Sequence, residues 1–235
     1  MAGRGALIEI GAGRYAIPEI GQSDIAYQPW QRLVHARLSS HGDYYVGFLT
    51  ALVEHRLVDL SERSITVAIG FANSSLTGKR AEIAGRPLHV IRSSKAIFSA
   101  QSGIEIVPSP SYARSDLQRT LVDALWAPKL FGSTETWATG WGRAASHGLI
   151  DAETVCRYAI CLGGVVPRRV GAMLSMTGHD LEARHYLPSR VRRADRRADL
   201  VADEPSRSDA ELNSFWQVRF NVPREQIEGW LLYGK

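Results

Sequence analysis

In "SDLQRTLVDALWAPKL", residues 115–130, the hydrophobic pattern changes from strand-like to helical. Its apolar residues recur at intervals of three and four, which predicts an amphipathic helix. Ser115 supplies a start signal for that helix. Arg119 and Asp123 stand four residues apart, so their side chains can pair across one helical turn. We therefore expect strands before this helix and a helical layer after it.

Before this helix, residues 64–108 alternate between apolar and polar side chains, as in "SITVAIG", "RPLHVIRSS" and "GIEIVPSP". Each run ends at a glycine, proline, serine or asparagine, which is typical of short strands joined by turns. Four or five strands are expected. The connections between them are too short for helical crossovers, so the sequence predicts one antiparallel or mixed sheet.

The N-terminal part of the chain predicts a hairpin followed by two helices. Residues 5–20, "GALIEIGAGRYAIPEI", place two short apolar runs around a glycine turn and approach a proline stop. Apolar residues at helical spacing predict a linking helix within residues 23–42. "GDYYVGFLTALVEHRLVD", residues 42–59, carries an apolar stripe of the same period, which predicts a second helix with Asp43 as its N-cap.

After the quoted stretch, the pattern predicts helices across residues 112–178. Their start signals are Ser115, Ser133, Asp151 and Pro167, and their stop signals are Gly132, Gly148, Gly163 and Gly178. Residues 195–212 are charged and poor in large apolar side chains, so we expect a mobile loop there. A final strand and helix are expected within residues 214–233. The fold class is therefore α+β, with a sheet packed against a helical layer.

Composition indicates a globular protein without a membrane partner. The chain has 235 residues, of which 45% are hydrophobic, and this is enough for a sizeable core. No stretch approaches the roughly 18 consecutive apolar residues of a membrane span, and the N-terminus lacks the apolar core of a signal peptide. We therefore expect a cytoplasmic location.

The cysteines and tryptophans are expected to pack in the core. Cys156 and Cys161, the two cysteines of the chain, lie five residues apart in a helical stretch, which supports neither a disulfide framework nor a zinc site. Indoles with apolar neighbours favour core packing over stacking on bases. This interpretation applies to Trp126, Trp137, Trp141, Trp216 and Trp230.

The sequence predicts no catalytic residue, metal site or cofactor, so the chain is not expected to be an enzyme. "SSLTGKR", residues 74–80, is similar to part of a phosphate-binding loop, but it lacks the first glycine and lies between expected strands. It leaves a nucleotide-using enzyme as a third hypothesis. His179 and His185 flank two acidic residues, an arrangement more typical of a helix end than of a metal site. No serine stands in a nucleophile elbow.

An arginine-rich segment concentrates the mild net charge of +4. "RVRRADRR", residues 190–197, contains Arg190, Arg192, Arg193, Arg196 and Arg197. Such a run can bind phosphates or an acidic partner. The alternative is a solvated face, whose electrostatic field is weakened by the aspartates and glutamates nearby in the sequence.

Three segments in matching order resemble the AbiEi-type antitoxins of type IV toxin-antitoxin systems. "GRYAIP" followed by "YYVGFLTALVEHRL" resembles the family's wing strand, linker and first helix of the C-terminal domain. "DLQRTLVDAL" resembles its strand-to-helix signature, and "VPRRVGAMLSMTG" with "FWQVRFNVP" resembles its closing helix and final strand. The resemblance extends over roughly residues 5–230.

The resemblance implies a regulatory protein with two partners. It implies repression of the protein's own operon through a winged helix-turn-helix that binds promoter DNA, and neutralisation of a nucleotidyltransferase-like toxin encoded in the same operon. The corresponding domains are a wing-like hairpin at residues 1–22, a linking helix at residues 23–42 and a C-terminal antitoxin domain at residues 43–235. The alternative function is a nucleic-acid-binding transcriptional regulator without a toxin partner.

The same resemblance assigns roles to particular residues. Arg4, Arg14 and Tyr15 are the DNA-binding residues that a wing would supply, since a wing lies along the phosphate backbone. Independently of the resemblance, the charge of Arg190, Arg192, Arg193, Arg196 and Arg197 makes them the candidate partner-binding residues, for an acidic toxin or for DNA. Family members carry two or three helices before the hairpin, including the recognition helix, whereas four residues precede the hairpin here. We therefore expect the recognition helices to be absent from this chain.

Overall fold

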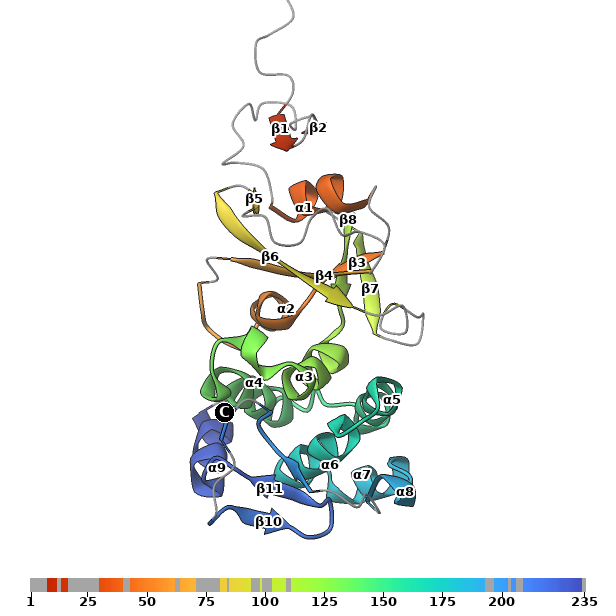
Figure 1. The fold of residues 1–235 in the computed structure, drawn as a ribbon, viewed down its shortest axis with the longest axis vertical. Helices are drawn as coiled ribbons and strands as arrows, with labels where there is room; N and C mark the ends of the chain where they lie inside the picture. The colour runs from red at the N-terminus through yellow and green to blue at the C-terminus, as the bar shows by residue number, and fades with distance from the viewer. Residues whose placement is uncertain are drawn as a thin grey trace, which may run out of the picture.

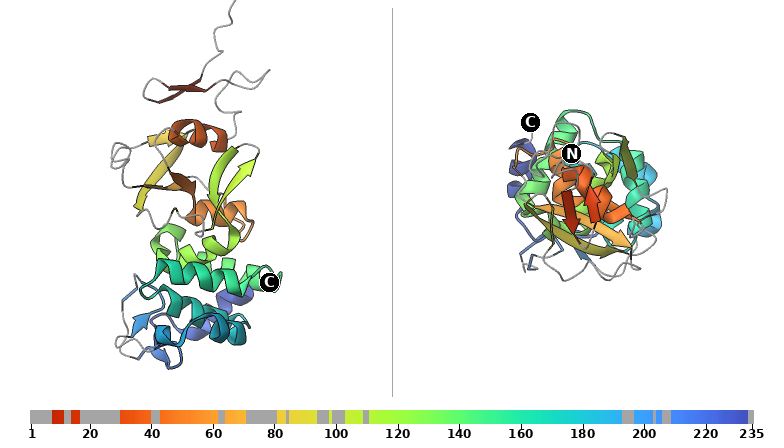
Figure 2. Two further views of the ribbon diagram at one scale, coloured as in Figure 1. Left: turned by 90° about the vertical axis from the view of Figure 1, so that its right-hand side faces the viewer. Right: turned by 90° about the horizontal axis from the view of Figure 1, so that it is seen from above.

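The elements of the chain follow one another along the long axis of the molecule. A hairpin stands at one end, followed by a helix, a six-stranded sheet, a helical layer and a small sheet (Figures 1 and 2). The computed structural model describes residues 8–11, 14–16, 30–39, 43–61, 64–70, 81–83, 85–93, 98, 103–108, 111–192, 197–202, 204–205 and 209–233.

The predicted N-terminal hairpin is confirmed. β1 (Ile8–Gly11) and β2 (Arg14–Ala16) pair antiparallel, with Ile8 opposite Ala16. The hairpin does not join the larger sheet; it lies beyond α1 (Trp30–Leu38), which it contacts (Figure 2). α1 confirms the predicted linking helix.

The expected mixed sheet is also confirmed, and its strands run in the order β5-β6-β4-β3-β8-β7. Neighbours β3 and β8, and β4 and β6, are parallel, whereas the other pairs are antiparallel. Figure 1 shows α1 on one side of the sheet and α2 (Phe48–Glu54) on the other. The strands are β3 (Tyr44–Val46), β4 (Ile65–Gly70), β5 (Ala81–Ile83), β6 (Arg86–Ser93), β7 (Ile104–Pro108) and β8 (Ser111–Ser115).

The prediction of one helix over residues 42–59 was wrong, because its first part is the central strand β3. All three residues of β3 are buried between β4 and β8, so the strand is covered on both faces and its apolar run imitates a helical stripe. Gly47, not Asp43, then caps α2. A Cβ at Gly47 would lie 2.6 Å from the Tyr45 ring, so a glycine suits the change from strand to helix.

Residues 112–115 also form a strand, β8, where a helix was expected. The N-cap of the next helix is therefore Asp116 rather than Ser115, and the Asp116 side chain accepts the backbone N–H of Arg119 at 2.7 Å. The Ser115 hydroxyl is instead buried, 2.8 Å from the hydroxyl of Thr120. Neighbouring residues with equal capping ability cannot be separated by sequence pattern alone.

The predicted helical layer is confirmed. Ser133 and Asp151 cap the helices that they were expected to start, because each side chain accepts a backbone N–H three residues on. The four predicted stop glycines all have positive φ, the conformation that glycine adopts without strain. The helices of this part are α3 (Leu117–Trp126), the 3-10 helix η5 (Pro128–Phe131), α4 (Thr134–Ser146), α5 (Ala152–Leu162), α6 (Val166–Met176), α7 (Asp180–Tyr186), α8 (Ser189–Arg192) and α9 (Arg224–Tyr233).

A second sheet of three short strands corrects the expectation of a mobile loop over residues 195–212. β9 (Ala198–Asp199) runs parallel to β11 (Val218–Phe220), which pairs antiparallel with β10 (Glu211–Asn213). The apolar residues just after β9 are buried, and the Asn221 side chain holds both the N–H and the carbonyl of Val201. The loop prediction was wrong where it covers residues 197–202 and 211–212; residues 193–196, 203 and 206–208 lie outside the described part.

Large aromatic side chains fill the core of the helical layer. Trp137, Trp141 and Trp216 have no exposed surface, and Trp126 and Trp230 pack against the core from its edge. Cys156 is buried as expected, and burial raises the pKa of its thiol to about 12. The expectation for Cys161 was wrong, because this residue lies on the exposed face of α5. Among the described residues, none of the helices has the length and apolarity that crossing a membrane requires.

Gly142 should be required where α4 crosses α9. A Cβ at this position would collide with the backbone of Leu231, which no rotamer change can relieve. Gly142→Ala is therefore expected to lower the free energy of unfolding by about 1–3 kcal/mol in urea titrations.

Gly229→Ala on α9 is the matched control. A Cβ there has no neighbour within 4 Å, so alanine should raise stability by up to about 1 kcal/mol through its helix propensity. Equal effects of the two substitutions would contradict the close helix crossing.

Candidate functional site

A buried ion pair lies within residues 115–130, where the hydrophobic pattern changes from strand-like to helical. Arg119 Nε is 2.7 Å from Asp123 Oδ1, and the two side chains are 1% and 0% exposed. The Tyr45 hydroxyl lies 3.3 Å from Asp123 Oδ2 and 3.3 Å from Arg119 Nη2. Burial raises the pKa of Tyr45 well above its ordinary value, so its hydroxyl stays protonated and donates to Asp123.

This cluster confirms the predicted pairing of Arg119 with Asp123. The structure buries the pair and adds Tyr45 from β3. Because all three side chains are buried, they do not form a surface for a partner. They join the central strand of the sheet to the first helix of the helical layer.

The arginines of "VPRRVGAMLSMTG" are also structural. Arg169 donates to the carbonyl of Leu125 at the end of α3 and to the carbonyl of Asp199 in β9, at 2.9 and 2.7 Å. Arg168 donates to the carbonyl of Gln217 at 3.4 Å. Both side chains are buried, so this motif fastens the helical layer to the small sheet and does not offer its charges to a partner.

The predicted DNA-binding residues are only partly placed. Arg14 and Tyr15 lie on β2 of the hairpin, at the end of the molecule away from the helical layer (Figure 1). Their side chains, and the whole of Arg4, lie outside the described part of the chain. The DNA-binding role of these three residues therefore stays a prediction.

The predicted partner-binding arginines have two different settings. The guanidinium of Arg192, on α8, lies 4.5 Å from the centre of the Phe215 ring. Arg190 and Arg197 are exposed. Arg193 and Arg196 lie outside the described residues. One arginine of the run is therefore packed against an aromatic ring, and two face solvent.

Sequence reasoning missed Arg184 and Phe215, which belong to the same surface. The Arg184 guanidinium lies 4.1 Å from the centre of the Phe215 ring, and its Nε is 2.7 Å from Asp180 Oδ2. A cation over an aromatic face is a favourable contact. Phe215 comes from the turn between β10 and β11, so no local pattern in the sequence indicates that it meets α7 and α8.

A hydrogen-bond chain holds this surface in place. The Trp216 indole donates to the Ser175 hydroxyl at 2.8 Å, and that hydroxyl lies 2.5 Å from Asp180 Oδ1. Gly171 makes room for the indole, since a Cβ there would lie 2.5 Å from it. Ser175 of α6 therefore links Asp180, the first residue of α7, to Trp216 beside the small sheet. We use the name arginine surface for Arg184 and Arg192, which contact Phe215, together with Phe215, the exposed Arg190 of α8 and the exposed Arg197 just before β9.

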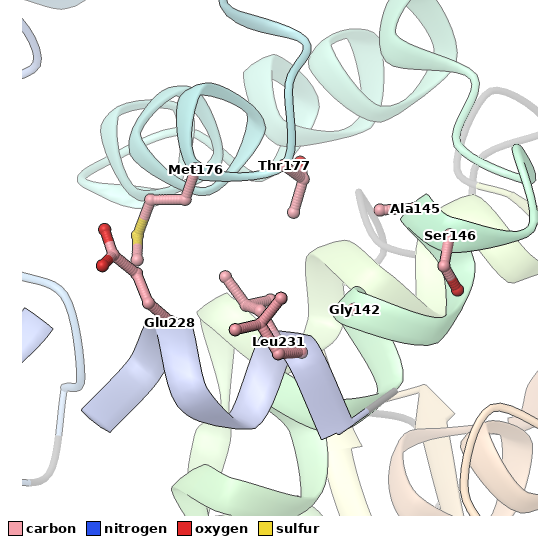
Figure 3. A pocket seen from close by; sticks show the side chains of 8 residues that line it. Gly142, Ala145, Ser146, Met176, Thr177, Glu228 and Leu231 are labelled. Atoms are coloured by element: carbon pink, nitrogen blue, oxygen red, sulfur yellow. The ribbon is translucent and has the colours of Figure 1, made fainter. Parts of the chain in front are cut away.

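A pocket of about 470 Å³ opens where α4, α6 and α9 end. In Figure 3, Thr177 and Leu231 point into it from opposite sides, and Met176 reaches toward Glu228. Most of the described lining is apolar, and Glu228 contributes a charged side chain. The lining residues are Gly142, Ala145, Ser146, Met176, Thr177, Glu228, Leu231 and Leu232.

The described residues contain no group of three or more histidine, cysteine or acidic side chains that could hold a metal ion. Residues 74–80, the fragment similar to a phosphate loop, lie outside the described part. The expected absence of catalysis, metal and cofactor stays a prediction.

Asp123→Asn should be strongly destabilising, because it leaves the Arg119 charge buried without its counter-ion. We expect a loss of about 3–5 kcal/mol in the free energy of unfolding. Tyr45→Phe removes a neutral hydroxyl from the same cluster and should cost about 1 kcal/mol. Urea unfolding of both variants tests this order; equal losses would mean that the ion pair does not dominate.

Comparison with known proteins establishes a shared fold for this chain but does not establish a family. No family model matches this sequence, and no curated protein matches it. The structure is similar to the crystal structure of RV2827C protein from Mycobacterium tuberculosis, with a TM-score of 0.64 and 12% sequence identity. The match covers 91% of this chain and 75% of that chain. At this identity the likeness establishes a shared fold alone.

Proposed function

We propose that this chain is the antitoxin of a type IV toxin-antitoxin system. Its described body would neutralise a nucleotidyltransferase-like toxin encoded in the same operon, and the winged helix to which the hairpin would belong would repress the operon's promoter. The observation that carries the proposal is that the three segments resembling AbiEi-type antitoxins include residues with specific structural tasks. They supply the hairpin, the buried ion pair and the buried arginines of α6.

The separation of the candidate interaction regions supports two partners. The hairpin stands at one end of the long axis, and α7, α8 and the small sheet, whose residues supply the arginine surface, lie at the opposite end (Figures 1 and 2). A DNA duplex lying on the hairpin end would leave the other end accessible. A second macromolecule can therefore use the helical layer without competing for the hairpin.

The arginine surface suits an acidic region of the toxin. Arg190 and Arg197 are exposed, so their charges act mainly on the rate of association and little on the fold. Arg192 is different, because its side chain packs on Phe215. A test of charge should therefore change Arg190 and Arg197 and leave Arg192 intact.

The alternative function is a nucleic-acid-binding regulator without a toxin. The sequence pI of about 9.2 and the arginine run favour it. Phosphate contacts would make such binding fall steeply with salt. This alternative predicts that the arginine surface binds DNA and that no protein partner is encoded beside the gene.

Growth rescue tests the antitoxin function directly. Cells that express the nucleotidyltransferase-like toxin of the same operon should stop growing, and co-expression of this chain should restore growth. No rescue by the folded chain would refute neutralisation by this chain. Both genes are placed under unrelated promoters, so that this chain cannot restore growth simply by repressing transcription of the toxin gene.

Arg190→Glu with Arg197→Glu should slow association with the purified toxin at low salt, because attraction becomes repulsion. The difference should shrink as salt screens the charges. Arg56→Glu with Lys129→Glu, two exposed charge reversals outside the arginine surface, is the matched control, because it changes the net charge by the same amount, and it should leave the rate unchanged. Equal slowing by both variants would show a general charge effect and exclude the arginine surface as the docking region.

A further inference from the structure

The pocket between α4, α6 and α9 has walls suited to an aliphatic chain. Met176, Leu231 and Leu232 supply apolar surface, and Gly142 lines the pocket where α9 lies close to α4. Its volume of about 470 Å³ lies within the range of ligand pockets. An aliphatic group that enters would be removed from water on several sides, which is favourable.

The electrostatics of the pocket favour a positive charge. Its lining comes from the last turns of three helices: Ala145 and Ser146 end α4, Met176 ends α6, and Leu231 and Leu232 lie in the last turn of α9. The C-terminal end of a helix carries a partial negative charge. Three such ends converge here, and among the described residues that line the pocket there is no lysine, arginine or histidine.

Glu228 adds a full negative charge at the edge of the pocket. Its Oε1 accepts from Arg224 Nε at 2.7 Å, and both side chains are nearly half exposed. An exposed pair of this kind is weak. A carboxylate accepts several hydrogen bonds, so Glu228 can bind a second cation while it keeps Arg224.

Two exposed apolar residues end α9, the pocket-lining Leu232 and the next residue, Tyr233. Leu232 is 57% exposed and Tyr233 is 79% exposed, whereas Leu231 between α4 and α9 is 7% exposed. Large apolar side chains next to a groove are typical of a protein-binding region. A protein partner that covers these side chains would also desolvate Glu228 and strengthen its contact with a cation.

We propose that this pocket receives a lysine or arginine side chain of the toxin, with the aliphatic stem against Met176 and Leu231 and the charged group at Glu228. The inference rests on the proposed function for the identity of the partner. The toxin would then make two charged contacts with this chain, one at the positive arginine surface and one at the negative Glu228. It must therefore present a basic residue as well as an acidic region. Such a pair of opposite charges fixes the orientation of the partner.

A titration without toxin tests the chemistry of the pocket. Butylguanidinium is the cationic probe, and pentanol is a neutral probe with a similar chain. Methyl NMR of the purified chain should show saturable shifts of Met176 with butylguanidinium. Glu228→Gln should weaken that binding about tenfold and leave pentanol unaffected. Absence of shifts with butylguanidinium, or an equal affinity in Glu228→Gln, would overturn the inference.

A second measurement uses the toxin itself. Glu228→Gln and Ala145→Trp, which fills the pocket, should each weaken the complex about tenfold or more in calorimetry. Glu225→Gln, an exposed acid on the same helix outside this pocket, should bind as the unchanged chain does. Tight binding by the two pocket variants would overturn the inference alone. Failure of the unchanged chain to bind toxin would instead refute the proposed docking of toxin on this body, whatever the probe titration shows.

Discussion

The structure depends on a charged pair that is removed from water at the joint between sheet and helices. Arg119 and Asp123 lie within one turn of α3, and Tyr45 meets both from the central strand β3. Burying two charges is costly, and the cost is offset only when geometry and hydrogen bonds are good. That requirement fixes how α3 leaves the sheet. The helices that follow, and the pocket at their ends, take their positions from this first helix.

Local signals predicted the elements that local chemistry determines. Ser133, Asp151 and the stop glycines set helix ends through contacts within a few residues, so the helical layer could be predicted from the sequence. β3 could not, because its conformation results from neighbours on both sides in the sheet. β9 was missed for the same reason: its partner β11 lies about twenty residues on and pairs in parallel.

The candidate sites, too, could be predicted from the sequence only where the signal was local. The arginine run was visible in the sequence, but the packing of Arg192 on Phe215 was not, since a distant turn supplies the ring. The pocket is built from three helix ends that are far apart in the chain. One signal could have indicated it: Gly142 stands within a predicted helix, where a glycine is unfavourable unless another backbone comes close. The charges of this chain support the partners that we propose.

We propose that opposite ends of one body serve different partners. Hydrogen exchange of the backbone amides measures this most directly, with the chain alone, with the toxin and with promoter DNA. The account predicts that toxin slows exchange in α7 and in the last turns of α4, α6 and α9, while β1, β2 and α1 exchange as in the free chain. Any protection by DNA should fall on the hairpin end. Protection of the hairpin end by toxin, or of the arginine surface by DNA, would contradict it.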